Sequence, residues 1–369
     1  MINPLAEKAP CLSQLGCSRM LLCFAENDDY IPKEIWIQFV EGVKKSGWKG
    51  DLKLKVKEVE NFYRLYKSGR FERFYDVHGL FYVPPSPQHP SNGVFSKDVT
   101  ISPHVSVRLY LPENIPNSQK IPVLVYFHGG GLVIDSAFFN LHHNYVNSLA
   151  SELKMVAVSV DYRLAPEVDV PTIYEDCWTA LQWVASHANE NSYNKDSWLT
   201  NFCDFGTVFI AGDSAGGNLV YHMTMRAGKE NLNNDLKITG SIFAYPYFFF
   251  PNVEIDEEGL ANKVWGYICP PLECGLLSPR DSPLINPLSK KAPSLMGLGC
   301  SRILVCMGKE DDLIPLGIGV RFVEGVKESG WDGEVVYLEF DDGHAFQMYK
   351  PECDEAKRMM KCYADFIHR

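Results

Sequence analysis

The chain has 369 residues, of which 46% are hydrophobic and 22% are charged, and this balance excludes a disordered or a fibrous protein. The net charge of −11 argues against a nucleic-acid partner, because a phosphate backbone binds basic surfaces. No apolar run approaches the roughly 18 residues of a membrane span, and the N-terminus carries no secretory pattern. Eleven cysteines are scattered without the spacing of a zinc site. We therefore predict a cytoplasmic protein with no membrane span, no metal and no cofactor, and the length suggests two domains.

The N-terminal segment repeats a segment near the C-terminus. Residues 2–50 and 285–333 align without gaps at a constant offset of 283, and well over half of the aligned positions are identical. Each copy has the pattern of an apolar strand, an acidic loop and an amphipathic helix that ends at Ser-Gly-Trp. Only the second copy continues into a strand that is followed by Gly343 and His344. We interpret residues 1–52 as a partial duplicate of residues 285–335 rather than an independent domain, and residues 53–369 as one complete domain.

Three roles are open to the duplicate. It is a passenger from a tandem-gene fusion or a mistaken gene model, or it docks as a replacement cap on the complete domain. Alternatively it exchanges with its twin in a second copy of the chain. We favour the passenger role, and the sequence leaves the oligomeric state open.

The middle of the chain alternates between β-rich apolar runs and helical patterns. Two short alternating strands are expected within residues 97–112. Apolar strands are expected at residues 121–127, 155–160, 207–211 and 241–245, and helices at residues 144–153, 174–187 and 217–227. Such alternation predicts βαβ units and a mostly parallel sheet, in which ligands bind at the carboxyl ends of the strands.

A glycine run follows the first of these apolar strands. His128, Gly129, Gly130 and Gly131 come directly after residues 121–127. An acyl-transfer reaction needs backbone N–H donors at the developing oxyanion, and side chains at those positions would block the approach of the substrate. The position of the run favours this use over a flexible turn.

A G-x-S-x-G motif follows the third apolar strand and precedes a helix. It reads Gly212, Asp213, Ser214, Ala215 and Gly216, in the strand–turn–helix context that a nucleophile elbow requires. The sharp turn exposes the serine, and the helix N-terminus directs N–H groups at the site. We expect Ser214 to be the nucleophile. Asp213 is expected to be solvated or to make a local hydrogen bond.

A nucleophilic serine needs a base, and the base needs an acid to orient it. Of the histidines after Ser214, we expect His222 and His368 to be packing or surface residues. His344 lies in a Gly-His loop between a strand and the last helix, so it is the predicted base. Asp311 and Asp312 follow a strand at its carboxyl end. We prefer Asp311 as the acid, because Asp312 precedes apolar residues and is expected to cap the turn.

Four segments together carry a family resemblance. HGGG, DYRLAPE (residues 161–167), GDSAGGN (residues 212–218) and the terminal Asp/His pair resemble the hormone-sensitive-lipase-like branch of the α/β-hydrolases. Within that branch, RLYKSGRFERF, SKDVTISP, LASELKMVAVSVDYRLAPE, GLGCSR and SGW resemble the plant carboxylesterase family. The resemblance covers about residues 58–369.

The resemblance implies an α/β-hydrolase fold, with an eight-stranded sheet under a cap of N-terminal helices and residues 248–277. It implies Ser214, Asp311 and His344 as the catalytic triad, and the N–H groups of Gly130, Gly131 and Ala215 as the oxyanion hole. The YRLAPE segment is structural in the family. The chain departs from the family at Leu132, where phenylalanine is common, and at Val168 and Asp169, where His-Pro is usual.

We therefore expect a serine carboxylesterase that acts on a small-molecule ester. Two alternatives from the same family remain. One is a dehydratase acting on 2-hydroxyisoflavanones, in which the same base and oxyanion hole perform an elimination. The other is a gibberellin-receptor-like binding protein, which His344 disfavours because the receptors lack the catalytic histidine. The aromatic residues 245–250 are expected to pack in the core, with a substrate pocket as the alternative.

Overall fold

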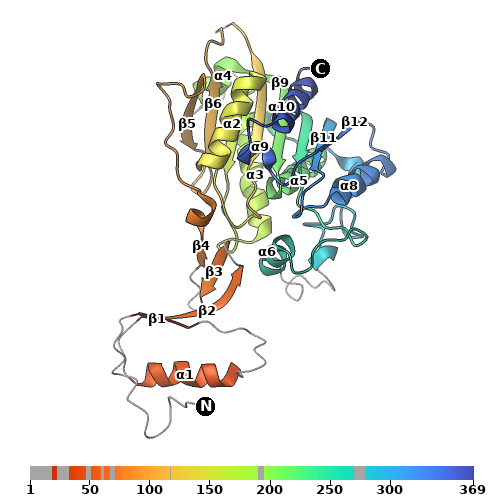
Figure 1. Ribbon diagram of the computed structural model, residues 1–369. Coiled ribbons are helices and arrows are strands. Elements are labelled where there is room, and N and C mark those ends of the chain that lie inside the picture. The colour runs from red at the N-terminus through yellow and green to blue at the C-terminus, as the bar shows by residue number, and fades with distance from the viewer. Residues whose placement is uncertain are drawn as a thin grey trace. The chain divides into compact units, whose positions relative to one another are not determined.

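The computed structural model divides the chain into two compact units, Met1–His78 and Gly79–Arg369 (Figure 1). The structure describes residues 19–22, 33–46, 51–59, 62–66, 71–116, 118–189, 195–269 and 279–369. The division falls after His78, whereas the duplicated segment ends at about residue 52.

The second unit is built on one sheet of eight strands. Their order across the sheet is β12-β11-β10-β9-β7-β8-β6-β5. The strands are β5 (Val94–Thr100), β6 (Ser106–Pro112), β7 (Ile121–Phe127), β8 (Val156–Asp161), β9 (Cys203–Asp213), β10 (Ile238–Ala244), β11 (Cys300–Gly308) and β12 (Glu334–Phe340). β6 pairs antiparallel with both of its neighbours, and the other neighbouring pairs are parallel. The predicted α/β-hydrolase sheet is confirmed.

Helices cover both faces of this sheet (Figure 1). The helices are α2 (Asn140–Leu153), α3 (Val170–Ser186), α4 (Ser197–Phe202), α5 (Ala215–Lys229), α6 (Leu260–Ile268), α8 (Leu316–Glu328), α9 (Phe346–Tyr349) and α10 (Asp354–Ile367). Side chains of α2 and α10 join Ile242 of β10 in one core cluster. The next residue, Phe243, contacts the ring of Phe322 on α8. Because successive side chains of a strand point to opposite faces, α2 and α10 cover one face and α8 the other.

Helix boundaries differ from the sequence predictions where capping residues were overlooked. The helix predicted at residues 174–187 is observed as α3, which begins earlier. The side chain of Asp169 accepts a hydrogen bond from the backbone N–H of Thr172, and Pro171 occupies the first turn. Both are helix-start signals.

The segment predicted to contribute to the cap is described only in part. Residues 260–268 of it form α6, and residues 270–278 lie outside the described residues. Among the helices that the structure describes, none is both long enough and apolar enough to cross a membrane.

The first unit contains a small sheet of four strands in the order β1-β2-β3-β4. Its elements are β1 (Arg19–Leu22), α1 (Lys33–Lys45), β2 (Asp51–Val59), β3 (Tyr63–Tyr66) and β4 (Phe71–Arg73). β1 and β2 are parallel, and β2, β3 and β4 are joined by antiparallel pairing. The duplicated segment thus supplies β1, α1 and the start of β2, and the residues that follow it complete a βαβ unit that continues into the antiparallel strands β3 and β4.

The duplicate reproduces the strand register of its twin. Arg19 of β1 is paired with Asp51 of β2, and Arg302 of β11 is paired with Glu334 of β12. These pairs, and the bounds of α1 and α8, are related by the same offset of 283. The repeated sequence therefore specifies the same local βαβ structure in both places.

One close contact in the hydrolase sheet bears on whether the duplicate could take the place of its twin. Gly319 of α8 lies so close to β11 that a Cβ atom there would be 2.3 Å from Cγ of Met307. The aligned residue of the duplicate is Trp36. An indole at this buried position would overpack the contact between α8 and β11. This argues against exchange of the duplicate with its twin.

We predict that Gly319→Trp, the residue that the duplicate carries, destabilises the second unit. Overpacking costs about 1–3 kcal/mol, more than the roughly 1 kcal/mol gained by replacing a helical glycine. The melting temperature should fall by several degrees. Val320→Ile, which copies Ile37 of the duplicate at an exposed position, should change it little. Equal melting temperatures for the two variants would restore the exchange as a possibility.

We predict that deletion of residues 1–52 leaves the second unit intact. The eight-stranded sheet contains no strand from these residues, and its core cluster lies within residues 94–367. The melting transition of the sheet domain and kcat/KM on a test ester should therefore stay within 2 °C and about twofold of the full chain. A large loss of either would show that the duplicate acts as a cap.

Candidate active site

Ser214 lies in a strained turn between β9 and α5. Its φ of 52° and ψ of −115° are outside the regions that residues with a side chain ordinarily occupy. Its backbone N–H donates to the carbonyl of Ala244 (2.8 Å), and its carbonyl accepts from the N–H of Tyr247 (2.9 Å). Hydrogen bonds to the segment that ends β10 therefore hold the strained conformation. The Ser214 side chain does not cap α5.

The two glycines of the motif allow the turn to approach β7. A Cβ atom on Gly216 would lie 2.0 Å from the carbonyl oxygen of Phe127, the last residue of β7. A Cβ atom on Gly212 would lie 2.4 Å from the carbonyl carbon of Gly216. Glycine is required at both positions because any side chain would push the turn away from the glycine run.

The glycine run forms a tight turn directly after β7. Gly130 has a φ of 92°, and its carbonyl accepts hydrogen bonds from the N–H groups of Val133 (3.1 Å) and Ile134 (3.0 Å). Gly131 also has a positive φ. Within the described part of the chain, no acceptor takes the backbone N–H of Gly130, Gly131 or Ala215.

The structure brings His344 and Asp311 together. Nδ1 of His344, in the loop after β12, lies 2.7 Å from Oδ2 of Asp311, in the loop after β11. The other Asp311 oxygen accepts the N–H groups of Leu313 (2.9 Å) and Ile314 (2.8 Å). The Asp311 carboxylate is buried, and 14% of the His344 side chain is exposed.

The expectation that Asp312 caps the turn is wrong, although the preference for Asp311 agrees with its hydrogen bond to His344. Asp312 is exposed, and it is Asp311 that binds the N–H groups of the turn. One carboxylate therefore both closes the turn and holds the imidazole. A second function of a turn residue leaves no trace in the sequence pattern.

The other two histidines after Ser214 have structural roles. His222 is stacked on Tyr174, and its Nε2 lies 3.0 Å from the carbonyl oxygen of Leu284. Burial lowers the pKa of His222 to about 4, so the ring is neutral. His368 bonds to the carbonyl of Leu153 at 2.8 Å.

Asp213 differs from its predicted solvated or local setting, because it is buried and bonded to distant parts of the chain. It accepts a hydrogen bond from the hydroxyl of Tyr126, in β7. Its Oδ1 also lies 3.8 Å from Nδ1 of His142, on α2. Nε2 of His142 lies 3.0 Å from Oδ2 of Asp135. The sequence does not mark Asp135 and His142, because nothing in their spacing connects them with the serine motif.

The YRLAPE segment supports the glycine run. The N–H of Ala165 donates to the carbonyl of Leu132 (2.8 Å), and the hydroxyl of Tyr162 donates to the carbonyl of His128 (2.6 Å). Arg163 is anchored by two hydrogen bonds to the buried carboxylate of Asp176 (2.8 and 2.7 Å). These contacts fit the structural role that the family resemblance implies.

The aromatic stretch after β10 is packed in the interior. Its aromatic residues are all buried: Tyr245, Tyr247, Phe248, Phe249 and Phe250. The Phe248 ring contacts Tyr221 of α5 and Phe322 of α8. Tyr245 is buried as well, but it also contacts the candidate site, since its ring centroid lies 5.3 Å from that of His344.

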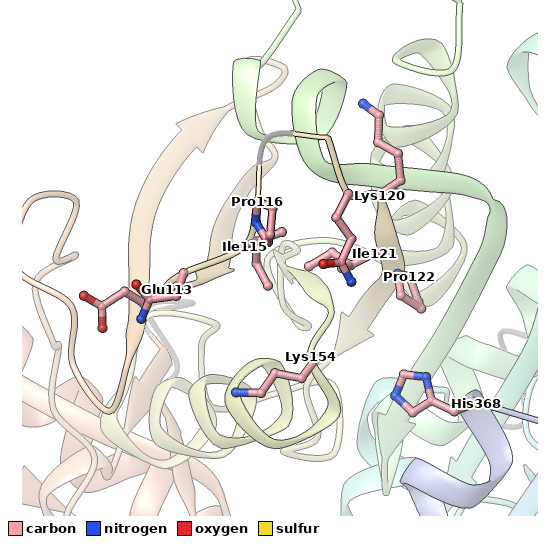
Figure 2. A pocket seen from close by; sticks show the side chains of 10 residues that line it. Glu113, Ile115, Pro116, Lys120, Ile121, Pro122, Lys154 and His368 are labelled. Carbon is pink, nitrogen blue, oxygen red and sulfur yellow. The ribbon is translucent and has the colours of Figure 1, made fainter.

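A pocket of about 480 Å³ with a mixed polar and apolar lining lies away from the predicted site residues (Figure 2). It is lined by Ile121, where β7 begins, by Lys154 after the end of α2, and by His368. It is therefore at the amino end of β7, whereas the glycine run follows the carboxyl end. In the described ranges, no group of three or more His, Cys, Asp or Glu residues is placed to hold a metal ion.

Known proteins match this chain over most of its length. A family model described as the alpha/beta hydrolase fold matches residues 124–348. A 2-hydroxyisoflavanone dehydratase of Glycine max is 41% identical over 85% of this chain and 98% of its own length. A probable carboxylesterase 13 of Arabidopsis thaliana is 40% identical over 82% of this chain and 94% of its own length.

A solved structure agrees with these sequence relatives. An esterase of Pyrobaculum calidifontis is 28% identical, with a TM-score of 0.56, over 76% of this chain and 86% of its own. The chain belongs to the α/β-hydrolase family, in its plant carboxylesterase-like branch, and is a hydrolase of the carboxylesterase type.

Proposed function

We propose that this chain is a cytoplasmic serine hydrolase that cleaves small or hydrophobic carboxylic esters. The hydrogen bond between Asp311 and His344 carries the proposal, since it joins the loops after two neighbouring strands. Ser214, Asp311 and His344 also follow one another along the chain in the order Ser, Asp, His that this fold uses. The strained turn at Ser214 supports it, because a nucleophile elbow has this backbone. The nucleophile, base, acid and oxyanion donors would all come from the chain itself, so the reaction needs no metal or cofactor.

In the proposed reaction, Ser214 Oγ attacks the ester carbonyl while His344 takes its proton. Because Nδ1 of His344 is bonded to Asp311, Nε2 is the nitrogen free to act as the base. Asp311 fixes the orientation of the ring and stabilises the imidazolium that forms. The imidazolium then protonates the leaving alcohol, and water releases the acyl group from Ser214 with His344 again as the base.

The negative oxygen of the tetrahedral intermediate would bind the N–H groups of Gly130, Gly131 and Ala215. Among the residues that the structure describes, none accepts these N–H groups, which supports this role. The Ala215 N–H also belongs to the first turn of α5, where the helix dipole favours a negative charge. Loss of one such donor costs about 2.7–4 kcal/mol in the transition state.

A dehydratase is the second candidate, because the relatives at 41% and 40% identity are named 2-hydroxyisoflavanone dehydratases. In that reaction His344 would remove a proton beside a carbonyl, and the same N–H groups would stabilise the enolate oxygen. The enolate would then expel the neighbouring hydroxyl group, which takes the proton back from His344 and leaves as water. Parallel assays with p-nitrophenyl esters and a 2-hydroxyisoflavanone distinguish the two activities. Gibberellin binding without turnover would instead support the receptor-like alternative, which the presence of His344 disfavours.

We predict that Ser214→Ala abolishes hydrolysis of p-nitrophenyl acetate. Without the nucleophile, kcat should fall by about 10³-fold or more. Ser301→Ala, which changes an exposed serine of β11, is the matched control and should retain full activity. A Ser214→Ala protein as active as the wild type would rule out the proposed mechanism.

We predict that Asp311→Asn lowers kcat by about 10²- to 10⁴-fold, because an amide cannot stabilise the imidazolium and favours the wrong tautomer of His344. The exposed neighbour provides the control, since Asp312→Asn should change kcat by less than about twofold. Circular dichroism should show both variants folded. Equal losses in the two variants would contradict the assignment of Asp311 as the acid.

A further inference from the structure

Three buried ionisable side chains lie together behind the candidate site. His142 is on α2, Asp135 ends the turn of the glycine run, and Asp213 directly precedes Ser214. All three are buried, and His142 is 3.0 Å from Asp135 and 3.8 Å from Asp213. The proposed mechanism uses none of them. Buried charges are costly to keep unless they are paired, so this group needs a physical explanation.

The two carboxylates belong to the two segments that carry the proposed oxyanion donors. Asp135 lies beside the glycine run, since a Cβ atom on Gly130 would be 3.1 Å from Cβ of Asp135. Asp213 lies against the same run, since a Cβ atom on Gly129 would be 2.4 Å from its Oδ2. His142 therefore lies between the end of the glycine run and the residue that precedes the nucleophile, in close contact with Asp135 and at the longer ion-pair distance of 3.8 Å from Asp213.

Four ionisable residues face His142, and two of them, Asp135 and Asp213, are carboxylates. Burial lowers the pKa of His142, but Asp135 and Asp213 outweigh it and raise the pKa to about 9. Burial alone would raise the pKa of Asp135, but the nearby His142 outweighs burial and the pKa is lowered. Burial raises the pKa of Asp213. The rings of His128 and Tyr126 also face His142. Burial lowers the pKa of His128 to about 4 and raises the pKa of Tyr126, so both side chains are uncharged. His142 is the positive charge of the group at neutral pH.

We propose that His142 is a positioning residue that ties Asp135 to Asp213 and so holds the N–H groups of Gly130 and Gly131 at the correct distance from Ser214. This rests on the proposed ester hydrolysis. Without a positive His142, the buried carboxylates would lose their counter-charge, and the glycine run and the serine turn would separate. A displacement of about 1 Å between donors and nucleophile costs up to about 10²-fold in rate.

The test compares His142→Gln with its neighbour variant His143→Gln. His143 is also buried on α2, but its Nδ1 bonds to Tyr110 (3.0 Å) and Arg108 (3.2 Å), away from the site. Burial lowers its pKa to about 4, so His143 is neutral and its loss removes no charge. Hydrolysis of p-nitrophenyl acetate is measured per active site, and sites are counted by end-point labelling of Ser214 with a fluorophosphonate.

We expect His142→Gln to lower kcat by about 10- to 100-fold and to change KM by less than about threefold, because oxyanion donors act in the transition state. His143→Gln should keep kcat within about twofold, whatever its melting temperature. The pH profile gives a second readout that a purely structural role would not move. Wild-type kcat should fall as the pH rises through about 9, where His142 loses its proton.

Asp135→Asn should move this alkaline limb to lower pH. The carboxylate of Asp135 raises the pKa of His142, so its removal lets His142 lose its proton earlier. The amide oxygen can still accept the N–H of Ser136, so the loop keeps its local hydrogen bond. The ion pairs of His142 should also contribute to the free energy of unfolding. This contribution is complete below about pH 6.5 and is lost as the pH rises through about 9.

A His142→Gln enzyme with wild-type kcat per labelled site would overturn the proposal, as would an alkaline limb that Asp135→Asn leaves in place. A lower melting temperature with unchanged kcat would also overturn it, because it shows a structural role alone. Failure of the proposed function looks different. In that case Ser214→Ala equals the wild type, whatever His142 does.

Discussion

The pairing of β7 with β9 is the constraint on which the rest of the site depends. Phe127, at the end of β7, is in register with Gly212, at the end of β9. The glycine run and the serine turn therefore leave the sheet side by side. Contact this close requires the missing side chain of Gly216, since a Cβ atom there would meet the Phe127 carbonyl at 2.0 Å. The strained backbone of Ser214 follows from the same approach, and hydrogen bonds to the end of β10 and to the segment after it keep it in place.

Polar interactions of two kinds surround this junction. In the loops after β11 and β12, Asp311 receives two backbone N–H groups as well as His344, so its orientation is determined from three directions. Behind the glycine run, His142 lies between Asp135 and Asp213, which belong to different segments. Buried ion pairs add little net stability, but breaking one is costly, so such a group holds one geometry against alternatives.

The duplicate shows how far a local sequence determines structure. Its strand register and helix bounds repeat those of β11, α8 and β12, because the apolar periodicity and the turn residues are the same. The context is different: β2 is paired on both sides, whereas β12 is at the edge of its sheet. Trp36 aligns with Gly319, where a Cβ atom in the hydrolase sheet would lie 2.3 Å from Cγ of Met307. The copies share a local fold, and their surroundings select different side chains.

The sequence by itself determined the order of the eight strands of the hydrolase sheet and of its longer helices, the β7 run with its glycine turn, and the strand–turn–helix around Ser214. These depend on local periodicity and on residues with special backbone freedom. The sequence did not predict α4, α6 or α9. Only the tertiary structure decided which Asp311 oxygen meets His344, and that Asp213 is buried beside His142 and Tyr126. The same holds for Asp135 and His142, which the sequence did not mark. Such contacts join residues of different strands and helices, and only the packing of the sheet brings them within a few ångströms of one another.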